Sequence, residues 1–516
     1  MSENITLASE NWMGKLNVTW DRKRIAPAII IFLLSAYLVL VPSIHFFPGV
    51  GYYNEKRILE IVVLLSCALY LLFSNDGLKK WLEIFLSIPL LARVGLFFIL
   101  VMGILSSSLA PYPKYAFLEV AHYVLLFILA IFIAAFYRYN PKFFIYWLSG
   151  VVTLCVFFYG VKFLSGYIMN FFKEGNYLWP HDDDVITSVY FSNFAQPFKI
   201  LGFAYIRYFN QLQTWTLPLL ALPYLLINDG NYKKGIWVLA SFWWMLVLAS
   251  GGRGTPLAVV LSLITCYILF RNKVKRIVKF QFYSITGGGA LYILFYHILN
   301  NGNGGIFDRV SEIGMKNGRL NIWGDGWQLL KNNLFTGIGP MHFADYNIHL
   351  NSLAHPHNAL VQFGVEWGIP VAIILSTIIL WGGISAIKKY STDNQKIYGL
   401  TSTAKGVIII SLFSGLLHSM VSGLIVMPVS QIMLVIIVGA AIGLFINNEK
   451  NDSSIPTHQY ISRILFLVTL VTLIYGIRVD AVDLLNRKDT YIQTTGSMQF
   501  SPRYWQEGFF DFNDTY

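Results

Sequence analysis

Long apolar runs separated by short polar or basic stretches dominate this chain from residue 25 to residue 477. A helix that crosses a membrane needs about 20 mostly apolar residues, so each long run predicts one crossing. The pattern predicts about twelve to thirteen transmembrane helices. Their expected ranges are 25–47, 58–74, 91–109, 118–137, 143–164, 209–227, 236–250, 256–270, 282–299, 359–387, 407–425, 430–446 and 464–477.

The composition agrees with a membrane protein. Of the 516 residues, 55% are hydrophobic and 13% charged, and the mean hydropathy is +0.56. A soluble core of this size cannot hide that much apolar surface, so we predict an all-α polytopic membrane protein. The net charge of +11 does not indicate nucleic-acid binding, because the basic residues stand in short clusters between apolar runs and form no basic face with interleaved aromatics.

The basic clusters also predict an orientation. They are Lys79 with Lys80, Arg138 with Lys142, Lys233 with Lys234, the run 271–279, and Lys388 with Lys389. By the positive-inside rule these connections are cytoplasmic, as is the N-terminal segment 1–24. The membrane domain is then 25–477, and its long loops 165–208 and 300–358 face the periplasm together with the tail 478–516.

The segment 353–368, LAHPHNALVQFGVEWG, contains the most reactive pattern in the chain. Pro356 disfavours helix at His355, and Asn358 is a good cap for a helix beginning at residue 359, so His357 is expected at that helix's edge. A histidine with a pKa near working pH can take a proton from a hydroxyl. The alternatives are a histidine that reaches water at the interface and a metal ligand, but His-x-His without a nearby carboxylate or cysteine is an incomplete set. Two further polar residues, Gln362 and Glu366, are expected on the same helix face.

Arg253, in SGGRGT, is the first candidate for binding an anion. A guanidinium binds phosphate through two parallel donors, and the neighbouring Gly252 and Gly254 let the backbone approach a bulky anion. An arginine at membrane depth is costly unless it is paired, which favours a functional role over one that only reaches lipid headgroups.

Two more arginines are predicted on the same outer face. Arg319, in GRLNIW, begins a short helix expected along the membrane surface, with Ile322 and Trp323 toward the bilayer; the alternative is a solvated charge. Arg207, in YIRYFNQLQTW, stands at the outer end of a helix. The amides that follow Arg207 are suited to sugar hydroxyls: Asn210, Gln211 and Gln213.

Other polar or glycine-rich features are assigned structural roles. The acidic run 182–184 is read as a solvated loop, because nucleotide sugars are not supplied on the outer face. His418 is read as a hydrogen-bonded core histidine, and the glycines 287–289 as a close helix contact. The three cysteines fall in apolar runs without metal-ligand spacing and are read as packing residues.

The ordered set SGGRGT, GRLNIW, TGIGPMHF and HPHNALVQFGVEWGIP resembles the O-antigen ligase and polymerase superfamily of bacterial envelope enzymes. The motif of that family is a histidine, then Asn, Ser or Gln, nine residues and a glycine, which His357, Asn358 and Gly368 match. The resemblance covers residues 203–429. Val371 departs from the small residue or tyrosine that often stands three places after the glycine, which loosens the assignment to the lipid A-core ligase branch.

The resemblance implies a GT-C-like enzyme of the bacterial inner membrane with its active site facing the periplasm. Its donor is a glycan on undecaprenyl pyrophosphate, which is transferred to an acceptor hydroxyl without a metal or cofactor. His357 is implied as the base, and Arg253 and Arg319, joined by Arg207, as the pyrophosphate ligands. A single displacement at the anomeric carbon inverts its configuration.

Three acceptors remain open within this interpretation. Lipid A-core is the first choice, a growing glycan the second, and a pilin or other protein serine the third, favoured by a tail containing Trp505 that suits acceptor docking. Outside this class the rival is a transporter for polyprenyl-linked glycans. A transporter places charged residues near the bilayer midplane, whereas here they crowd one face.

Overall fold

The computed structural model describes residues 22–47, 49–172, 202–298, 318–347, 354–392, 400–446, 455–495 and 500–508, and every regular element in these ranges is helical. The longer helices are α1 (Arg22–Leu40), α2 (Tyr52–Phe73), α4 (Leu90–Leu109), α5 (Pro113–Tyr139), α6 (Pro141–Phe172), α10 (Gly230–Ala249), α11 (Gly254–Phe270), α12 (Lys275–Tyr292), α17 (Ile369–Thr392), α18 (Leu400–Ser419), α19 (Pro428–Phe445) and α20 (Ile455–Val482). The shorter elements are α3 (Asn75–Ser87), α8 (Ile206–Leu219), α9 (Ala221–Leu226), α14 (Gly318–Lys331), α15 (Phe343–Asn347), α16 (Ala359–Trp367), α21 (Leu484–Thr495), the 3₁₀ turn η1 (Arg271–Lys273) and the π-helical turn η2 (Ile293–Ile298). The acidic run 182–184 lies outside the described residues.

The predicted all-α polytopic membrane protein is confirmed. Within the described ranges, eight helices are long and apolar enough to cross a membrane: α4, α5, α6, α11, α17, α18, α19 and α20. The pair α2 and α3, bent by 104°, makes a ninth if it is one broken crossing. This set is smaller than the predicted twelve to thirteen, because the other predicted ranges fold into helices that are shorter, broken or less apolar.

Two predicted helices are broken for identifiable reasons. The range 209–227 divides into α8 and α9, because Pro223 has no amide hydrogen to donate to the carbonyl of Leu219. The range 359–387 is not one helix but α16 and α17, separated at Gly368, which has φ 91°. Any side chain at Gly368 would overlap the backbone of Phe335, so the break depends on glycine.

Close packing around α5 forms the centre of the molecule. Helices α19 and α20 both pack against α5, and a Cβ at Gly439 of α19 would stand 2.5 Å from the carbonyl oxygen of Ala130 in α5. Helices α10 and α12 pack as a close pair at Gly287 and Gly288, where a Cβ on either would stand 2.5 Å from a side chain of α10. The structural role predicted for these two glycines is confirmed.

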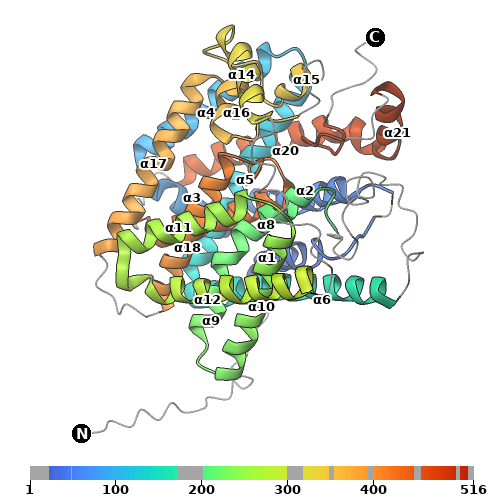
Figure 1. Ribbon diagram of the computed structural model, residues 1–516. Helices are drawn as coiled ribbons and strands as arrows, with labels where there is room; N and C mark the ends of the chain where they lie inside the picture. The colour runs from blue at the N-terminus through green and yellow to red at the C-terminus, as the bar shows by residue number, and fades with distance from the viewer. Residues whose placement is uncertain are drawn as a thin grey trace.

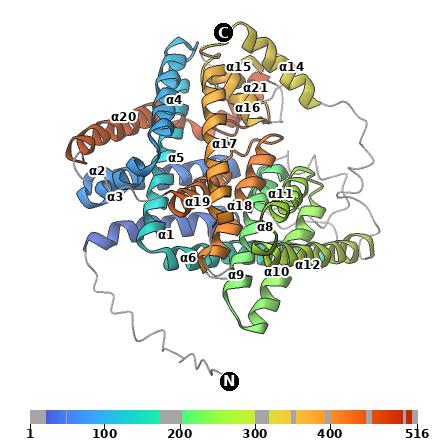
Figure 2. The ribbon, with the colours of Figure 1, turned by 90° about the vertical axis from the view of Figure 1, so that its left-hand side faces the viewer.

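Basic residues of three predicted cytoplasmic clusters meet at the C-terminal ends of α17 and α19. Arg138 donates to the carbonyl of Ile446 at 2.5 Å, and Lys389 donates to the carbonyl of Phe445 at 3.1 Å. Lys273 donates to two carbonyls at the end of α17. These bonds satisfy terminal carbonyls of α17 and α19, which attract cations. Helices α14, α15 and α16 lie together at the upper end of the molecule in both ribbon views (Figures 1 and 2).

Candidate active site

Residues 354–358 form a turn in front of α16 that positions His357. Asn358 caps α16 as predicted, since its side-chain oxygen accepts from two amides of the first turn at 3.0 and 3.1 Å. His357 has φ 54°, a left-handed conformation that is uncommon outside glycine. Its ring is half-buried and packs edge-on against His355, with ring centroids 4.2 Å apart. Such backbone strain persists only where the surroundings enforce it, and it clusters at functional sites.

Three arginines from three helix ends form a positively charged group beside this turn: the charges of Arg207 and Arg319 act on His357, and the charge of Arg253 acts on Arg319. Arg207 lies in the first turn of α8, Arg253 directly precedes α11, and Arg319 lies in the first turn of α14. Desolvation by the surrounding protein atoms, and then the positive charges of Arg207 and Arg253, lower the pKa of Arg319. Arg253 and Arg319 are exposed and Arg207 is half-buried. No carboxylate in the described part of the chain forms an ion pair with any of the three.

The positive surroundings affect the histidines. Burial, and then the charges of Arg207 and Arg319, lower the pKa of His357 to about 3. Burial, and then the neighbouring His357, lower the pKa of His355 well below its ordinary value. The pKa of His357 therefore lies below the near-neutral value expected from the sequence, because the sequence does not reveal the burial of the ring or the guanidinium groups around it. Both imidazoles are neutral at neutral pH, so each has a nitrogen able to accept a proton.

Hydrogen bonds from residues on both sides of Arg253 hold its loop against α8. The side-chain nitrogen of Asn210 donates to the Ser250 hydroxyl at 2.7 Å, and the Thr255 hydroxyl donates to the Asn210 carbonyl at 2.7 Å. Gly252 is required because a Cβ there would overlap the Asn210 amide. The close approach predicted for this glycine is therefore to the Asn210 side chain, and it sets the spacing of the arginines.

The amides of α8 serve this framework and are not available to a sugar. Gln211 donates to the hydroxyl of Ser422 at 3.0 Å, and Gln213 donates to the carbonyl of Trp243 at 3.1 Å. With Asn210 they are all at most 3% exposed. The expectation that they bind sugar hydroxyls was wrong, because α8 turns this face toward the core of the bundle.

His418 lies directly beneath the Arg253 loop. Its Nδ1 is 2.6 Å from the Thr214 hydroxyl, and a Cβ at Gly254 would stand 2.5 Å from its Nε2. His418 is buried, so its assignment as a hydrogen-bonded core histidine is confirmed. Gly254 lets α11 begin against that ring.

Helix α14 brings Arg319 to the site by packing against α16. Ile322 and Leu330 are buried in a small apolar cluster that includes Val365 of α16. The indole nitrogen of Trp323 donates to the carbonyl of Pro356, at 2.9 Å, inside the HPHN turn. The expectation that Ile322 and Trp323 face the bilayer was therefore wrong, and their contacts explain how the start of α14 reaches His357.

The two polar residues of α16 face away from the arginines. Glu366 is fully buried and accepts from the guanidinium of Arg503 at 2.5 Å. With its amide oxygen turned toward Arg503, Gln362 accepts from both terminal nitrogens of that guanidinium at 2.9 Å. Sequence reasoning missed Arg503 and its other partner, Glu119 of α5. The available signal was a carboxylate inside an apolar run, which is expensive in a membrane unless it is paired.

Comparison with known proteins agrees with the motif. Residues 237–376 match a family model described as O-Antigen ligase, a range that includes Arg253, Arg319, His357 and Gly368. No curated protein matches the chain. The ligase model covers α11, α14, α16 and the start of α17, which together carry most of the arginine and histidine cluster. The match over residues 237–376 supports the predicted resemblance to the O-antigen ligase and polymerase superfamily, and at that level it supports glycan transfer of the O-antigen ligase type.

Proposed function

We propose that this enzyme transfers a glycan from undecaprenyl pyrophosphate to an acceptor hydroxyl at the periplasmic face of the inner membrane. The observation that carries this proposal is the charge around His357: Arg207 and Arg319 lie close enough to lower its pKa, and Arg253 lies close enough to Arg319 to lower the pKa of that arginine. The arginines bind the pyrophosphate, and His357 is the base.

The charge of the cluster favours a polyanionic ligand. Three guanidinium groups held near one another repel, and no carboxylate of the described residues pairs with them. A pyrophosphate offsets this repulsion and offers paired oxygens that match the guanidinium fork. The same fixed charges stabilise the negative charge that develops on the pyrophosphate as it leaves, so the reaction is proposed to need no metal.

The reaction proceeds in a single displacement. The acceptor oxygen attacks the anomeric carbon as the bond from that carbon to the pyrophosphate oxygen breaks, and the bonding electron pair leaves with the phosphate. The acceptor's proton passes to the neutral imidazole of His357. Attack opposite to the leaving group inverts the anomeric configuration.

Donor binding and base strength are linked in this mechanism. Burial and the charges of Arg207 and Arg319 hold the pKa of His357 at about 3, which makes its imidazole a weak base. A bound pyrophosphate neutralises those charges, so the pKa of His357 rises when the donor is in place. His357 is thus a stronger base beside its donor than in the free enzyme.

The acceptor is proposed to be lipid A-core, with a growing glycan second and a protein serine third. The family description, O-Antigen ligase, supports this order. The tail does not support protein docking, because Trp505 is buried and donates to Asp480 at 2.9 Å. A polyprenyl-glycan transporter remains the rival outside the class.

The decisive experiment is reconstitution of the purified enzyme in liposomes with an undecaprenyl-pyrophosphate glycan. Lipid A-core, the lipid-linked glycan alone and a pilin are supplied in separate reactions, with EDTA throughout. We expect transfer to lipid A-core and release of undecaprenyl pyrophosphate. Transfer to the glycan or the pilin but not to lipid A-core would contradict the proposed acceptor. Loss of activity in EDTA would contradict the metal-free mechanism. Movement of the donor across the bilayer without transfer would favour the transporter.

A further inference from the structure

Residues 500–508 form a buried segment that threads between α2, α5 and α16. Every residue from Ser501 to Gly508 is buried. At Gly508, with φ 77°, a Cβ would overlap the carbonyl of Ser501, so the two ends of the segment meet. We call residues 500–508 the C-terminal strap.

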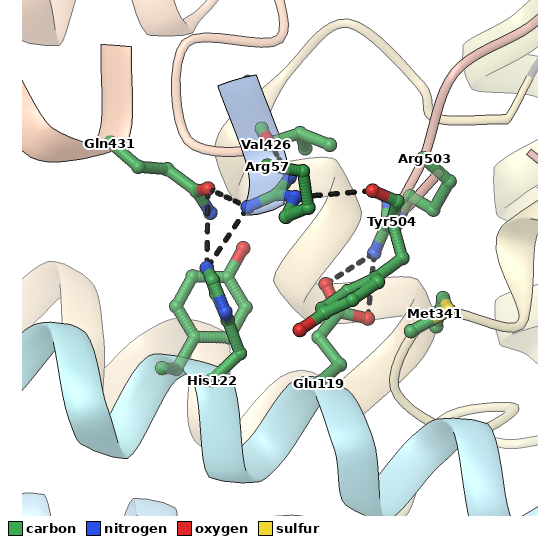
Figure 3. A pocket seen from close by; sticks show the side chains of 9 residues that line it. Arg57, Glu119, His122, Met341, Val426, Gln431, Arg503 and Tyr504 are labelled. Carbon is green, nitrogen blue, oxygen red and sulfur yellow. Dashed lines mark hydrogen bonds and ion pairs between the residues drawn. The ribbon is translucent and has the colours of Figure 1, made fainter. Parts of the chain in front are cut away.

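Helix α2 binds the backbone of the strap. The Tyr53 hydroxyl donates to the carbonyl of Arg503 at 2.5 Å, and Arg57 Nε donates to the carbonyl of Tyr504 at 3.1 Å. Arg57 also donates to Gln431 Oε1 at 2.5 Å, so it joins the strap to α19 (Figure 3). These bonds explain why α2 can bury Arg57 in an apolar bundle.

Arg503 joins this strap to α5 and α16. Its Nη2 lies 2.8 and 3.0 Å from the two carboxylate oxygens of Glu119 in α5, as the dashed lines in Figure 3 show. The same nitrogen lies 2.5 Å from Glu366, and Gln362 accepts from the guanidinium one turn earlier in α16. Arg503 is only 1% exposed, so this ion pair is protected from water and counterions.

The strap also holds the turn in front of the base. The amide of Ala354 donates to the Ser501 hydroxyl at 2.7 Å, and Arg503 Nη1 donates to the Ala354 carbonyl at 3.5 Å. His357 therefore lies between two attachments of the strap, one at Ala354 and one on α16. None of the hydrogen bonds described for the strap reaches the helix ends that carry Arg207, Arg253 and Arg319.

We propose that Arg503 is a positioning residue that fixes the turn of His357 relative to the donor arginines. This inference rests on the proposed function, because it assigns His357 the role of base. Arg503 acts on the placement of the imidazole and does not touch the substrate. A misplacement of the base by about 1 Å can lower the rate about 100-fold. Loss of the Arg503 contacts is therefore expected to lower kcat and to leave donor affinity unchanged.

Arg503→Met is the primary variant, assayed in liposomes for kcat, for KM with the lipid-linked donor and for donor binding. We expect kcat to fall about 100-fold while KM for the donor changes less than about two-fold. Arg503→Lys keeps the positive charge but loses the parallel donors of the guanidinium, so its kcat is expected to lie between those of Arg503→Met and the wild type. In the His357→Ala background, Arg503→Met is expected to cause no further loss, because both changes act on the same step.

A second pair of variants avoids leaving Arg503 without a carboxylate. Glu366→Leu removes its partner on α16, and Glu119→Leu, the matched control, removes its partner on α5. We expect kcat to fall at least about ten-fold for Glu366→Leu and less than about two-fold for Glu119→Leu. Equal effects of the pair, or donor binding that falls in step with kcat, would show that the strap is merely structural and overturn the inference.

The two proposals fail in different ways. If His357→Ala is inactive while Arg503→Met retains wild-type kcat, only the positioning role is lost. If His357→Ala retains wild-type kcat, the proposed base and the positioning role are both wrong.

Discussion

At the scale of single residues, the site combines a strained histidine with unpaired positive charge. His357 has φ 54°, and burial with the charges of Arg207 and Arg319 lowers its pKa to about 3. These features are costly in an empty site, and they fit a site completed by an anion. Three predictions test the residues separately.

The first prediction concerns the base. Asparagine tolerates the left-handed backbone of His357 but cannot accept the acceptor's proton, so His357→Asn removes the chemistry with little added strain. We expect transfer to fall by about 10²–10⁴-fold with normal membrane abundance and donor binding. His355→Asn, next to it but without the assigned role, is expected to lose less. Transfer by His357→Asn at the wild-type rate would exclude His357 as the base.

The second prediction concerns pH. The profile of kcat/KM for the donor reports the free enzyme. Because the pKa of His357 is lowered to about 3, its base form is fully present at neutral pH and is lost only as pH falls well below the ordinary value. We expect no acid limb above about pH 5 in the wild type. Arg319→Met removes a cation that disfavours the imidazolium, so its acid limb shifts to higher pH. An acid limb near about pH 6.5 in the wild type would contradict the lowered pKa.

The third prediction separates charge from geometry at the arginines. If Arg253 and Arg319 bind pyrophosphate through paired donors, lysine keeps the charge and loses the fork. We expect Arg253→Lys and Arg319→Lys each to lower kcat by about 10²–10³-fold in the liposome assay. Arg276→Lys, on an exposed position of the basic end, is the control and keeps full activity. Full activity of both Arg253→Lys and Arg319→Lys would contradict the proposal that these arginines bind pyrophosphate through paired donors.

At the scale of elements, the site depends on interruptions in apolar helices. Gly368 ends α16, and the backbone of the preceding loop then passes along that helix end: the amides of Ile338 and Gly339 donate to the carbonyls of Val365 and Glu366 at 2.9 and 3.0 Å. These bonds satisfy carbonyls that a helix end leaves without partners. The loop thereby connects α14 to α16 and keeps Arg319 beside the base.

The fourth prediction tests this interruption. Gly368→Ala places a Cβ against the Phe335 backbone at a left-handed φ, so it is expected to destabilise the protein by more than about 1 kcal/mol and to lower transfer. Gly364→Ala, in the interior of α16, meets only Ala372 at 3.9 Å and is expected to stabilise slightly. Thermal unfolding in detergent compares the two. Equal midpoints for both variants would mean that the break does not need glycine.

The sequence predicted the apolar helices better than their contacts. Long apolar runs predicted α4, α5 and α19 because membrane crossing constrains length and hydropathy directly. The capping preference of asparagine correctly indicated that Asn358 caps α16. The contact of Arg503 with Glu366 could not be predicted, because the two residues are 137 positions apart and Arg503 lies in no recognisable pattern. The inward face of Asn210 and Gln211 was missed for a similar reason, since their partners come from other helices.

At the scale of the whole molecule, the basic residues and the arginine cluster lie toward opposite ends of the bundle. Helix α11 begins after Arg253 and ends at the basic turn η1, and α17 begins near Phe335 and ends where Lys273 binds its carbonyls. This arrangement supports the proposed orientation, with the basic end in the cytoplasm.

The fifth prediction tests that orientation with single cysteines. Cys67, Cys155 and Cys266 are buried, so the wild-type background is expected to remain unlabelled by an impermeant thiol reagent. Gln328→Cys on α14 is exposed and is expected to react in intact spheroplasts, whereas exposed cysteines at Asn272 and Ser391 react only after lysis. Labelling of Asn272→Cys but not Gln328→Cys in intact spheroplasts would put the arginine cluster in the cytoplasm.

The strap has a consequence for synthesis. Arg57 binds the backbone of Tyr504, which lies 447 positions later in the sequence. Arg57 is therefore synthesised well before this partner. At a synthesis rate of about 5–20 residues per second, the interval between the two residues lasts roughly 20–90 s. During this time Arg57 and Glu119 lie in apolar helices without their strap partners. The nascent enzyme therefore has incompletely paired buried charges and is inactive at this stage. Glycan transfer begins only after the strap has packed between α2, α5 and α16.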